Sequence, residues 1–348
     1  MNLLPILIAI GTYTANTGSE GIYLLELDPE NQKYRTVNTL AAQNPSFLHY
    51  SADNSMLYYV EEIGAGTVNS VPLNPEQKSF GQITSLPTQG GSPCHVAVSH
   101  EHQTAIASNY SGGNLATFSL AEDGRITSAE AVHPFYASSV LPDRQKQSHI
   151  HSSFYSPDGN KVFVQDLGGD HIYQFESDEI KANNATYQTH KMKPGSGPRH
   201  LTFSPDQQFV YILNELSGTV DVYHLNEAGE IADHVQQITT DDRPGYSGCA
   251  EIRLSPDGKF LYASNRAEKN SISVFSRAQD GRLQLLQVIS TEGTSPRNFN
   301  FSPDGKWVIV ANQQSNNLSI FARDPESGLL TFSGMKVDIP SPVCIVNL

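Results

Sequence analysis

The stretch Pro198-Arg-His-Leu-Thr-Phe-Ser-Pro-Asp-Gln-Gln-Phe-Val-Tyr-Ile-Leu-Asn-Glu215 contains two short apolar runs joined by a Ser-Pro-Asp-Gln turn. Aromatic and β-branched residues are frequent on both sides of the turn, which is typical of paired strands. Proline and the residues that follow it supply the backbone angles of a tight turn. This stretch therefore predicts a β-hairpin with strands before and after residues 204–207.

The same turn recurs at an interval of roughly fifty residues. Its copies begin at residues 51, 99, 156, 204, 255 and 302, so the spacings are 48, 57, 48, 51 and 47 residues. Each unit continues into a third strand that ends in an aromatic residue, as at 219–223 and 271–275. A fourth strand is expected near 235–239 and 283–289. Four strands repeated in this way predict the blades of a β-propeller.

Six turns account for six blades, and the two ends of the chain supply the seventh. Residues 342–348 resemble the first strand of a unit, whereas residues 3–10 and 21–26 resemble the second and third. A blade built from both ends would close the ring and leave no open sheet edge. We therefore expect an all-β, seven-bladed propeller with four-stranded antiparallel blades, forming a single domain over residues 1–348. Its last blade would be shared by about residues 1–30 and 339–348.

The amino-acid composition argues against some classes of binding partner and indicates a cellular compartment. The formal net charge of −14 disfavours nucleic acid and anionic membranes, because both attract basic surfaces. The three cysteines, Cys94, Cys249 and Cys344, are too few and odd in number for a disulfide framework. Residues 1–10 are apolar but lack the basic start and small-residue cleavage site of a signal peptide. We expect a cytoplasmic protein, with an oligomeric state that the sequence does not predict.

The hairpin also predicts which residues share one rim of the central channel. Arg199 and Glu215 lie eight residues before and after the turn centre, so they should face each other on neighbouring strands. The equivalent first-strand positions are Ser46, Cys94, His151, Arg199, Ala250, Arg297 and Val343, and the second-strand positions are Glu62, Tyr110, Leu167, Glu215, Arg266, Gln313 and Thr12. These residues differ between blades while the turn persists, which indicates a functional site rather than a structural repeat.

The longest spacing contains an insert at residues 133–146. It leads into the strand that carries His149 and His151, so it should overhang the same rim. Long connections of this kind in compact domains are frequently functional. We interpret the insert as a candidate loop that covers a substrate.

Several motifs in the second half of the chain resemble one known family. They are Gly197-Pro-Arg-His-Leu-Thr-Phe-Ser-Pro-Asp206 with Asn-Glu-Leu at 214–216, Gly248-Cys-Ala-Glu-Ile-Arg-Leu-Ser-Pro-Asp-Gly258 with Ser-Asn-Arg at 264–266, and Pro296-Arg-Asn-Phe-Asn-Phe301. The chain resembles the propeller-type 6-phosphogluconolactonases, a group that includes fungal 3-carboxy-cis,cis-muconate lactonizing enzymes. The likeness runs over nearly the whole chain and is densest over residues 148–321.

The resemblance implies a hydrolase of the pentose phosphate pathway that opens 6-phosphogluconolactone or a related acidic sugar lactone. It implies no cofactor and no metal. The catalytic residues that it implies are His151, Arg199, Glu215 and Arg266. Positions on the rim add Arg297, Gln313 and Tyr110 as candidate substrate-binding residues, and His149 is added because it is expected to share the strand face of His151.

The residue types fit lactone hydrolysis. Glu215 or His151 would take the proton of the attacking water, and arginines would stabilise the oxyanion and bind a phosphate or carboxylate. Which of the two is the base stays open, and His149 is an alternative to His151. Gln313 and Tyr110 are equally well explained as channel packing.

Other interpretations use the same residues. Arg199 and Glu215 can form an ordinary cross-strand ion pair. His149 and His151 with Asp166 and Asp170 suggest a metal site, which the neighbouring arginines disfavour because they repel cations. The function alternatives are a lactone-forming cycloisomerase of the carboxymuconate type and a non-catalytic binding scaffold.

Overall fold

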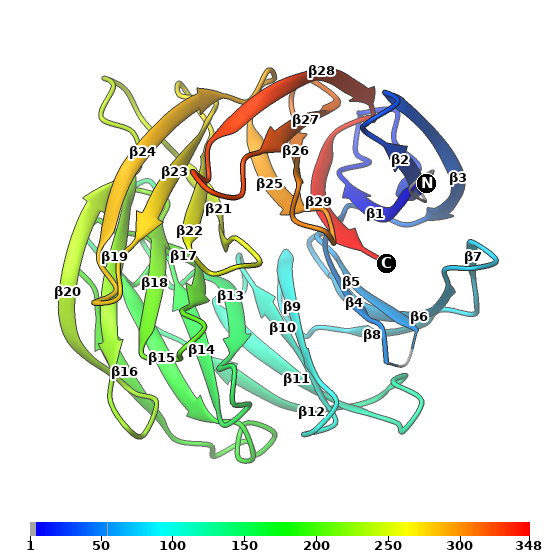
Figure 1. The fold of residues 1–348 in the computed structure, drawn as a ribbon. Coiled ribbons are helices and arrows are strands. Elements are labelled where there is room, and N and C mark those ends of the chain that lie inside the picture. The colour runs from blue at the N-terminus through cyan, green and yellow to red at the C-terminus, as the bar shows by residue number, and fades with distance from the viewer. Residues whose placement is uncertain (1–4, 54) are drawn as a thin grey trace.

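The computed structural model describes residues 5–53 and 55–348, and over these residues the chain forms 29 strands in seven antiparallel sheets without a helix. The sheets are arranged as blades around a central channel (Figure 1). The predicted seven-bladed propeller is therefore confirmed. The start of the expected N-terminal strand, residues 1–4, and the last residue of the first turn, Asn54, lie outside the described residues.

The strands of each blade run from the channel outward, and the blades follow in ring order from the one that contains both ends of the chain. They are β29 (Pro342–Asn347), β1 (Ile6–Thr12), β2 (Gly21–Asp28) and β3 (Lys33–Ala41); β4 (Pro45–Ser51), β5 (Met56–Glu61), β6 (Thr67–Asn74) and β8 (Thr84–Pro87), with the short β7 (Ser79–Phe80) also on β6; β9 (Pro93–Ser99), β10 (Thr104–Asn109), β11 (Asn114–Leu120) and β12 (Ile126–Pro134); β13 (Ile150–Tyr155), β14 (Lys161–Asp166), β15 (His171–Glu176) and β16 (Tyr187–Lys191); β17 (Pro198–Phe203), β18 (Phe209–Asn214), β19 (Thr219–Leu225) and β20 (Ile231–Thr239); β21 (Cys249–Leu254), β22 (Phe260–Asn265), β23 (Ser271–Arg277) and β24 (Leu283–Ser290); and β25 (Pro296–Phe301), β26 (Trp307–Asn312), β27 (Asn317–Arg323) and β28 (Leu330–Asp338).

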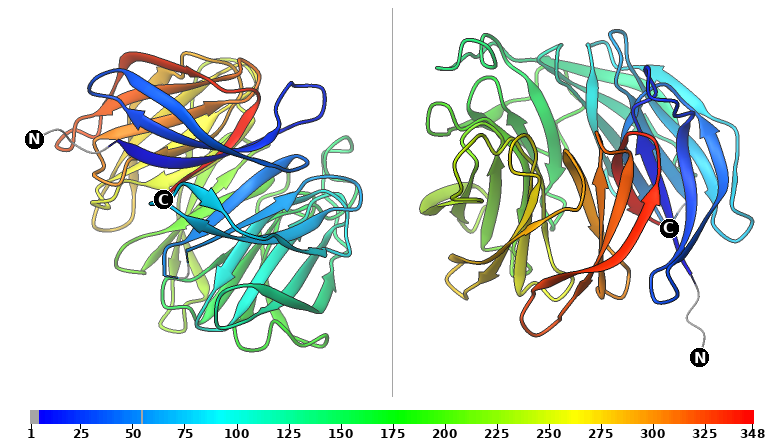
Figure 2. Two further views of the ribbon diagram at one scale, coloured as in Figure 1. Left: turned by 90° about the vertical axis from the view of Figure 1, so that its right-hand side faces the viewer. Right: turned by 90° about the horizontal axis from the view of Figure 1, so that it is seen from above.

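Both ends of the chain build the blade that closes the ring. The last strand, β29, pairs antiparallel with β1, with Ile345 opposite Ile10. Figure 1 shows these two strands side by side where the ends of the colour scale meet. The blade also includes β3, so its N-terminal part extends to residue 41, past the expected boundary near 30. Figure 2 shows the blades packed around the ring, with connecting loops on both faces.

The recurring turn joins the first and second strands of a blade. Its conformation is fixed because its serine hydrogen-bonds both the aspartate and the backbone. Ser156 Oγ donates to Asp158 Oδ1 across 2.6 Å and accepts a hydrogen bond from the amide of Lys161 at 2.9 Å. The turns that begin at Ser204, Ser255 and Ser302 repeat the arrangement. These four turns are thus fixed by their own side chains, which keeps the register of the two inner strands constant in their blades.

Apolar side chains fill the spaces between neighbouring blades, and a repeated tyrosine adds a polar link. The buried hydroxyl of Tyr211 donates to the carbonyl of Gly281 in the next blade at 3.1 Å. Tyr58 and Tyr262 make the same contact with Gly124 and Gly328. A satisfied buried hydroxyl contributes about 1 kcal/mol, whereas an unpaired one would cost more.

A β-bulge interrupts each of the innermost strands near its start. The residues left without a partner in the register are Ser46, Cys94, His151, Arg199, Ala250, Arg297 and Val343, and in β21 also Glu251. The first seven are the first-strand rim positions predicted from the sequence. A bulge turns the extra residue out of the regular pleat, so each blade presents one side chain at this rim independently of its own core.

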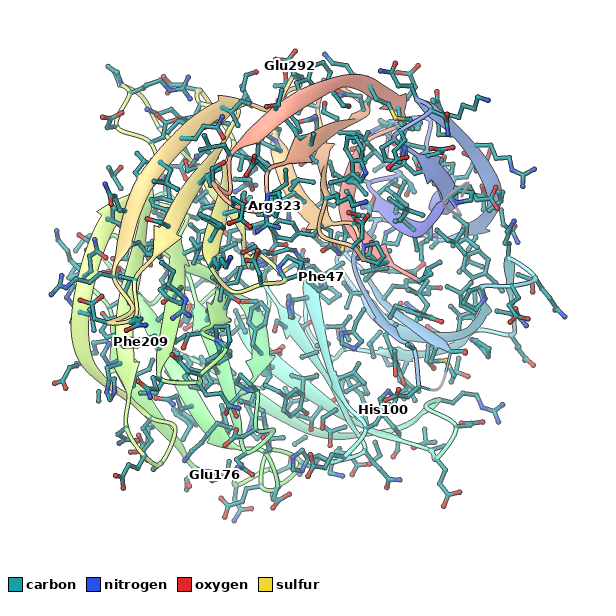
Figure 3. The ribbon with its side chains drawn as sticks, in the orientation of Figure 1. Phe47, His100, Glu176, Phe209, Glu292 and Arg323 are labelled. Atoms are coloured by element: carbon teal, nitrogen blue, oxygen red, sulfur yellow. The ribbon has the colours of Figure 1, made fainter. Side chains whose placement is uncertain are left out.

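Below the rim, side chains close the channel. Phe47 lies near the middle of the ring in Figure 3, with its ring 4.1 Å from that of His95 and 5.9 Å from that of His200. Phe154 packs against both histidines, at 4.8 and 5.8 Å. These four rings come from different blades, so they plug the channel and form a floor under the rim.

Candidate active site

The second-strand rim residues are held by a repeated backbone contact. The amide of Glu215 donates to the carbonyl of Gly197 at 2.8 Å, and that of Tyr110 donates to Ser92 at 3.0 Å. In the closing blade the equivalent amide is that of Tyr13, which donates to Ser341 at 3.0 Å. The expectation that Thr12 occupies this position is therefore wrong by one residue, because Thr12 pairs with Pro342 inside the ladder.

The rim encloses a cavity of about 190 Å³ on the axis of the ring. Its lining residues are Tyr13, Glu62, Cys94, Tyr110, Arg144, His151, Glu215, Arg266 and Arg297. Since a water molecule occupies about 30 Å³, the cavity suits a small polar molecule. It collects His151, Glu215, Arg266, Arg297 and Tyr110 from the predicted set, and Arg199 lies against Glu215.

Glu215 is buried and is held by three arginines. Arg199 Nε and Arg266 NH2 both contact Oε2, at 3.1 and 2.8 Å, whereas Arg144 NH2 contacts Oε1 at 2.6 Å. Burial alone would raise the pKa of this carboxyl, but Arg266, Arg199 and Arg144 hold it at about 2. Glu215 is therefore ionised throughout the neutral range.

The second carboxylate of the cavity faces the fourth arginine. Tyr13 donates its hydroxyl proton to Glu62 Oε2 at 2.7 Å, and Arg297 NH2 lies 3.8 Å from the same oxygen. The guanidinium of Arg297 also lies 5.3 Å from the centre of the Tyr13 ring. Burial opposes the charge of Arg297, but Tyr13 and Glu62 raise its pKa. Four arginines thus oppose two glutamates, which leaves an excess of positive charge in an acidic protein.

His151 is the buried imidazole of the cavity. Its ring contacts that of Tyr110 edge-on at 5.7 Å and that of His200 at 5.4 Å. Its Nδ1 has no hydrogen-bond partner within the part of the chain that the structure describes. Burial, with Arg199 and His200, holds the pKa of His151 well below its usual value. The imidazole is consequently neutral and can accept a hydrogen bond.

The insert between β12 and β13 contributes to the cavity through Arg144. Besides Glu215, this side chain contacts the hydroxyls of Tyr110 at 3.3 Å and Tyr246 at 3.5 Å. The next residue, Gln145, is fully buried and donates from Nε2 to the carbonyl of Leu167 at 3.0 Å. The loop therefore overhangs the rim as expected, but the residue that enters the cavity was not singled out from the sequence.

Two candidate residues, His149 and Gln313, do not line the cavity. The ring of His149 stacks on Tyr110 at 4.4 Å, and its Nδ1 lies 2.9 Å from the Tyr110 carbonyl oxygen. Gln313 is half-buried, and its backbone amide donates a hydrogen bond to the Ser295 carbonyl at 3.0 Å. His149 therefore supports Tyr110 from outside the cavity.

The residues considered as a metal site have other roles. Asp166 accepts hydrogen bonds from the amides of His149 and Gly169, and Asp170 accepts them from Gly195 and Gly197. Over residues 5–53 and 55–348 no group of three or more His, Cys, Asp or Glu side chains is placed to hold a metal ion. Within the same residues the three cysteines are free and buried, and no helix is long and apolar enough to cross a membrane.

Two larger cavities, of about 440 and 460 Å³, open where the innermost strands end, on the other side of the plug. They share Phe47, Phe154 and Arg253. Arg253 donates from Nε to the carbonyl of Phe299 at 2.8 Å, and its NH2 lies 3.7 Å from Glu251. The smaller cavity at the rim concentrates the charged groups, so it is the candidate active site.

Fold and site together define a propeller with an arginine-rich, positively charged cavity on its axis, closed at one end. Comparison with known proteins agrees with that class. The family model "Lactonase, 7-bladed beta-propeller" matches residues 7–347, and the chain belongs to this family. It is an enzyme, a lactone-hydrolysing carboxylic-ester hydrolase.

Individual relatives cover nearly the whole chain. A 6-phosphogluconolactonase of Bacillus subtilis is 36% identical, covering 97% of this chain and 96% of the relative. A 6-phosphogluconolactonase of Formosa agariphila is 34% identical, with coverages of 92% and 93%. The solved structure of the periplasmic gluconolactonase of Pseudomonas aeruginosa superimposes with a TM-score of 0.93 at 32% identity and covers 99% of both chains.

Proposed function

We propose that this enzyme hydrolyses an acidic sugar lactone, with 6-phosphogluconolactone as the leading substrate, and that it does so without a metal. The observation that carries the proposal is that three arginines form ion pairs with Glu215 inside a small, closed-ended cavity. An excess of guanidinium groups suits a phosphate or carboxylate, which arginine binds with two parallel hydrogen bonds. The names of the relatives from Bacillus subtilis and Formosa agariphila support the same substrate.

Each group has a distinct role in this proposal. Glu215 accepts the proton of the attacking water, and neutral His151 accepts a hydrogen bond from that water or from a sugar hydroxyl. Arg266 and Arg297 bind the anionic group and stabilise the oxyanion that forms at the lactone carbon. Arg199, which donates to Glu215 and to the Ala250 carbonyl, positions the base.

Metal independence follows from the charge of the cavity. The positive excess of the arginines repels a divalent cation, and the guanidiniums supply the stabilisation of developing negative charge that a Lewis acid would provide. Hydrolysis by the purified enzyme should therefore survive dialysis against EDTA. A loss of activity that Zn²⁺ or Mg²⁺ restores would overturn this part of the proposal.

The compartment that fits the proposed substrate is the cytoplasm, where sugar phosphates of the pentose phosphate pathway are formed. The three free, buried cysteines are compatible with a reducing compartment. Fractionation of the source cells, with detection of the native protein, tests this location.

The decisive experiment follows the hydrolysis of freshly generated 6-phosphoglucono-δ-lactone, corrected for spontaneous opening. Wild type is compared with Glu215→Gln and Arg266→Gln, and with Glu227→Gln as a control at an exposed surface carboxylate. We expect Glu215→Gln to lose roughly 10²–10⁴-fold in kcat, which is the usual contribution of a general base. The control should match wild type. Absence of any acceleration by wild type would reject the substrate, and glucono-δ-lactone and carboxymuconate would then be tested.

A further inference from the structure

The arginines around Glu215 differ in how they are anchored. Arg199 and Arg266 share the Oε2 oxygen, and both also donate to backbone carbonyls of β21 or the residue before it, Ala250 and Gly248. Their side chains are only 3% and 15% exposed. These two arginines are therefore fixed parts of the rim.

Arg144 alone contacts the other oxygen, Oε1, and it is held differently. Its side chain is 38% exposed, and the hydrogen bonds that its guanidinium makes are to side chains, those of Glu215, Tyr110 and Tyr246. It comes from a loop, whereas its neighbour Gln145 fixes the backbone of that loop by a buried amide. The side chain can consequently leave Glu215 without movement of the loop.

This contact weakens the proposed base. Two arginines occupy Oε2, and Arg144 occupies one of the two lone-pair positions of Oε1 and lowers the basicity of the carboxylate. An anionic group in the cavity would compete with Glu215 for Arg144, because both are acceptors of the same guanidinium donors. Arg144 is the arginine that can change partner, because it is the most exposed of the three and its guanidinium makes no hydrogen bond to the backbone of the residues that the structure describes.

We propose that Arg144 is a gate which the anionic group of the substrate displaces: bound to the substrate's phosphate or carboxylate, it releases Oε1 of Glu215 for catalysis. This inference rests on the proposed lactonase function. Once released, Oε1 takes a proton from water as the water oxygen bonds to the lactone carbonyl carbon. The ring carbon–oxygen bond then breaks and the leaving oxygen receives the proton from Glu215. The new carboxyl group ionises and gives its proton to solvent, and Arg144 returns to Glu215 when the product leaves.

If Arg144 acts as a gate, the enzyme should distinguish charged from neutral lactones by their kcat values. Wild type, Arg144→Gln and Arg125→Gln are each assayed with 6-phosphoglucono-δ-lactone and with neutral glucono-δ-lactone. Arg125 is a matched control, because it is an exposed arginine that pairs with Asp123 away from the cavity. Thermal unfolding of all three proteins verifies that they are folded.

In Arg144→Gln we expect kcat on the neutral lactone to rise while its KM stays unchanged, because Oε1 has lost its competing donor. The kcat/KM on the phosphorylated lactone should fall, so that the preference for it drops roughly tenfold to a hundredfold, the worth of one charge-assisted hydrogen bond. Arg125→Gln should match wild type on both substrates.

Two results would overturn the gate and leave the proposed function standing. Equal loss of kcat on both lactones would make Arg144 a general part of the catalytic cavity. A raised KM for the phosphorylated lactone alone, with the neutral lactone unaffected, would make it a simple binding group. Failure of wild type on both lactones would instead reject the proposed function.

Discussion

The hydroxyl of Tyr13 donates to Oε2 of Glu62 across 2.7 Å and thereby ties the blade that closes the ring to the next blade. The same oxygen faces Arg297 at 3.8 Å, so Tyr13 orients the carboxylate that balances this arginine.

Replacing Tyr13 by Phe removes that hydrogen bond and leaves a half-buried carboxylate oxygen less well satisfied. We expect a loss of about 1 kcal/mol in the free energy of unfolding, measured by urea denaturation. The kcat/KM on the phosphorylated lactone should also fall, because Glu62 and Arg297 lose their fixed geometry. Tyr34→Phe, at an exposed tyrosine, is the control. Unchanged kinetics for Tyr13→Phe would exclude Tyr13 from substrate positioning.

Substitutions of His149 and His151 separate the two histidines that the sequence left as alternatives. We expect His151→Ala to lower kcat roughly tenfold to a hundredfold, because the attacking water or a sugar hydroxyl loses its hydrogen-bond acceptor in the cavity. His149→Ala should keep kcat within a few-fold, since its ring supports Tyr110 from outside the cavity. Steady-state kinetics on the same lactone decide between them. The reverse order of effects would transfer the catalytic role to His149.

Stability should fall in two stages on acidification. Burial lowers the pKa of His49 and His200 from 6.5 to about 4, so these groups are neutral in the fold while the unfolded chain binds protons. The stability that they contribute is complete above pH 6.5 and is lost between 6.5 and 4, at roughly 1.4 kcal/mol per pH unit for each group. Three arginines hold the pKa of Glu215 at about 2, and Arg253 with His200 holds that of Glu251 at about 2, against 4.5 unfolded. Their contribution is complete above 4.5 and is lost from 4.5 down to 2.

Urea midpoints measured between pH 8 and pH 3 check this profile. His49→Gln should reduce the slope of the first stage by the contribution of one group, because glutamine does not titrate while His200 still does, and it should leave the second stage in place. A midpoint that is constant from pH 6.5 to 4 in wild type would contradict the neutral state of these buried histidines.

Gln145 should control access to the cavity through the loop that carries Arg144. Gln145→Ala removes the donor to the Leu167 carbonyl and the acceptor for the Leu141 amide. We expect faster tryptic cleavage after Arg144 and Lys146 and a raised KM. Gln314→Ala, at an exposed glutamine, provides the comparison. Equal cleavage rates in Gln145→Ala and wild type would show that other contacts fix the loop.

Much of the fold and of the rim could be predicted because one local motif sets the register. The Ser-Pro-Asp turn is fixed by its own hydrogen bonds, so residues counted outward from it arrive at equivalent places in the four blades that contain it. Arg199 and Glu215, eight residues on either side, meet at 3.1 Å as that counting predicts. The closing blade has no such turn, because its two inner strands are far apart in the chain, and Thr12 was accordingly assigned in place of Tyr13.

Residues whose direction depends on irregular backbone could not be predicted. Arg144 lies on a loop without periodicity, so nothing in the sequence distinguishes it from Lys146 two residues later. Gln313 occupies a rim position by register, but its side chain does not reach the cavity. A count of residues along a strand fixes a position in the ladder, whereas the rotamer that follows depends on neighbours in other blades.

The bulges at the start of the innermost strands separate two kinds of residue in each blade: those paired in the ladder and the bulged residue at the rim. Ladder pairing constrains the residues before and after the bulge, whereas the bulged residue has no partner in the ladder of its own blade. Exchange of His151, Arg199 or Arg297 therefore leaves the strand pairing of its blade intact, and the contacts that change are those across the rim. Each blade thus contributes one rim position whose side chain can vary while the strand pairing stays the same. New chemistry on this architecture therefore requires few substitutions.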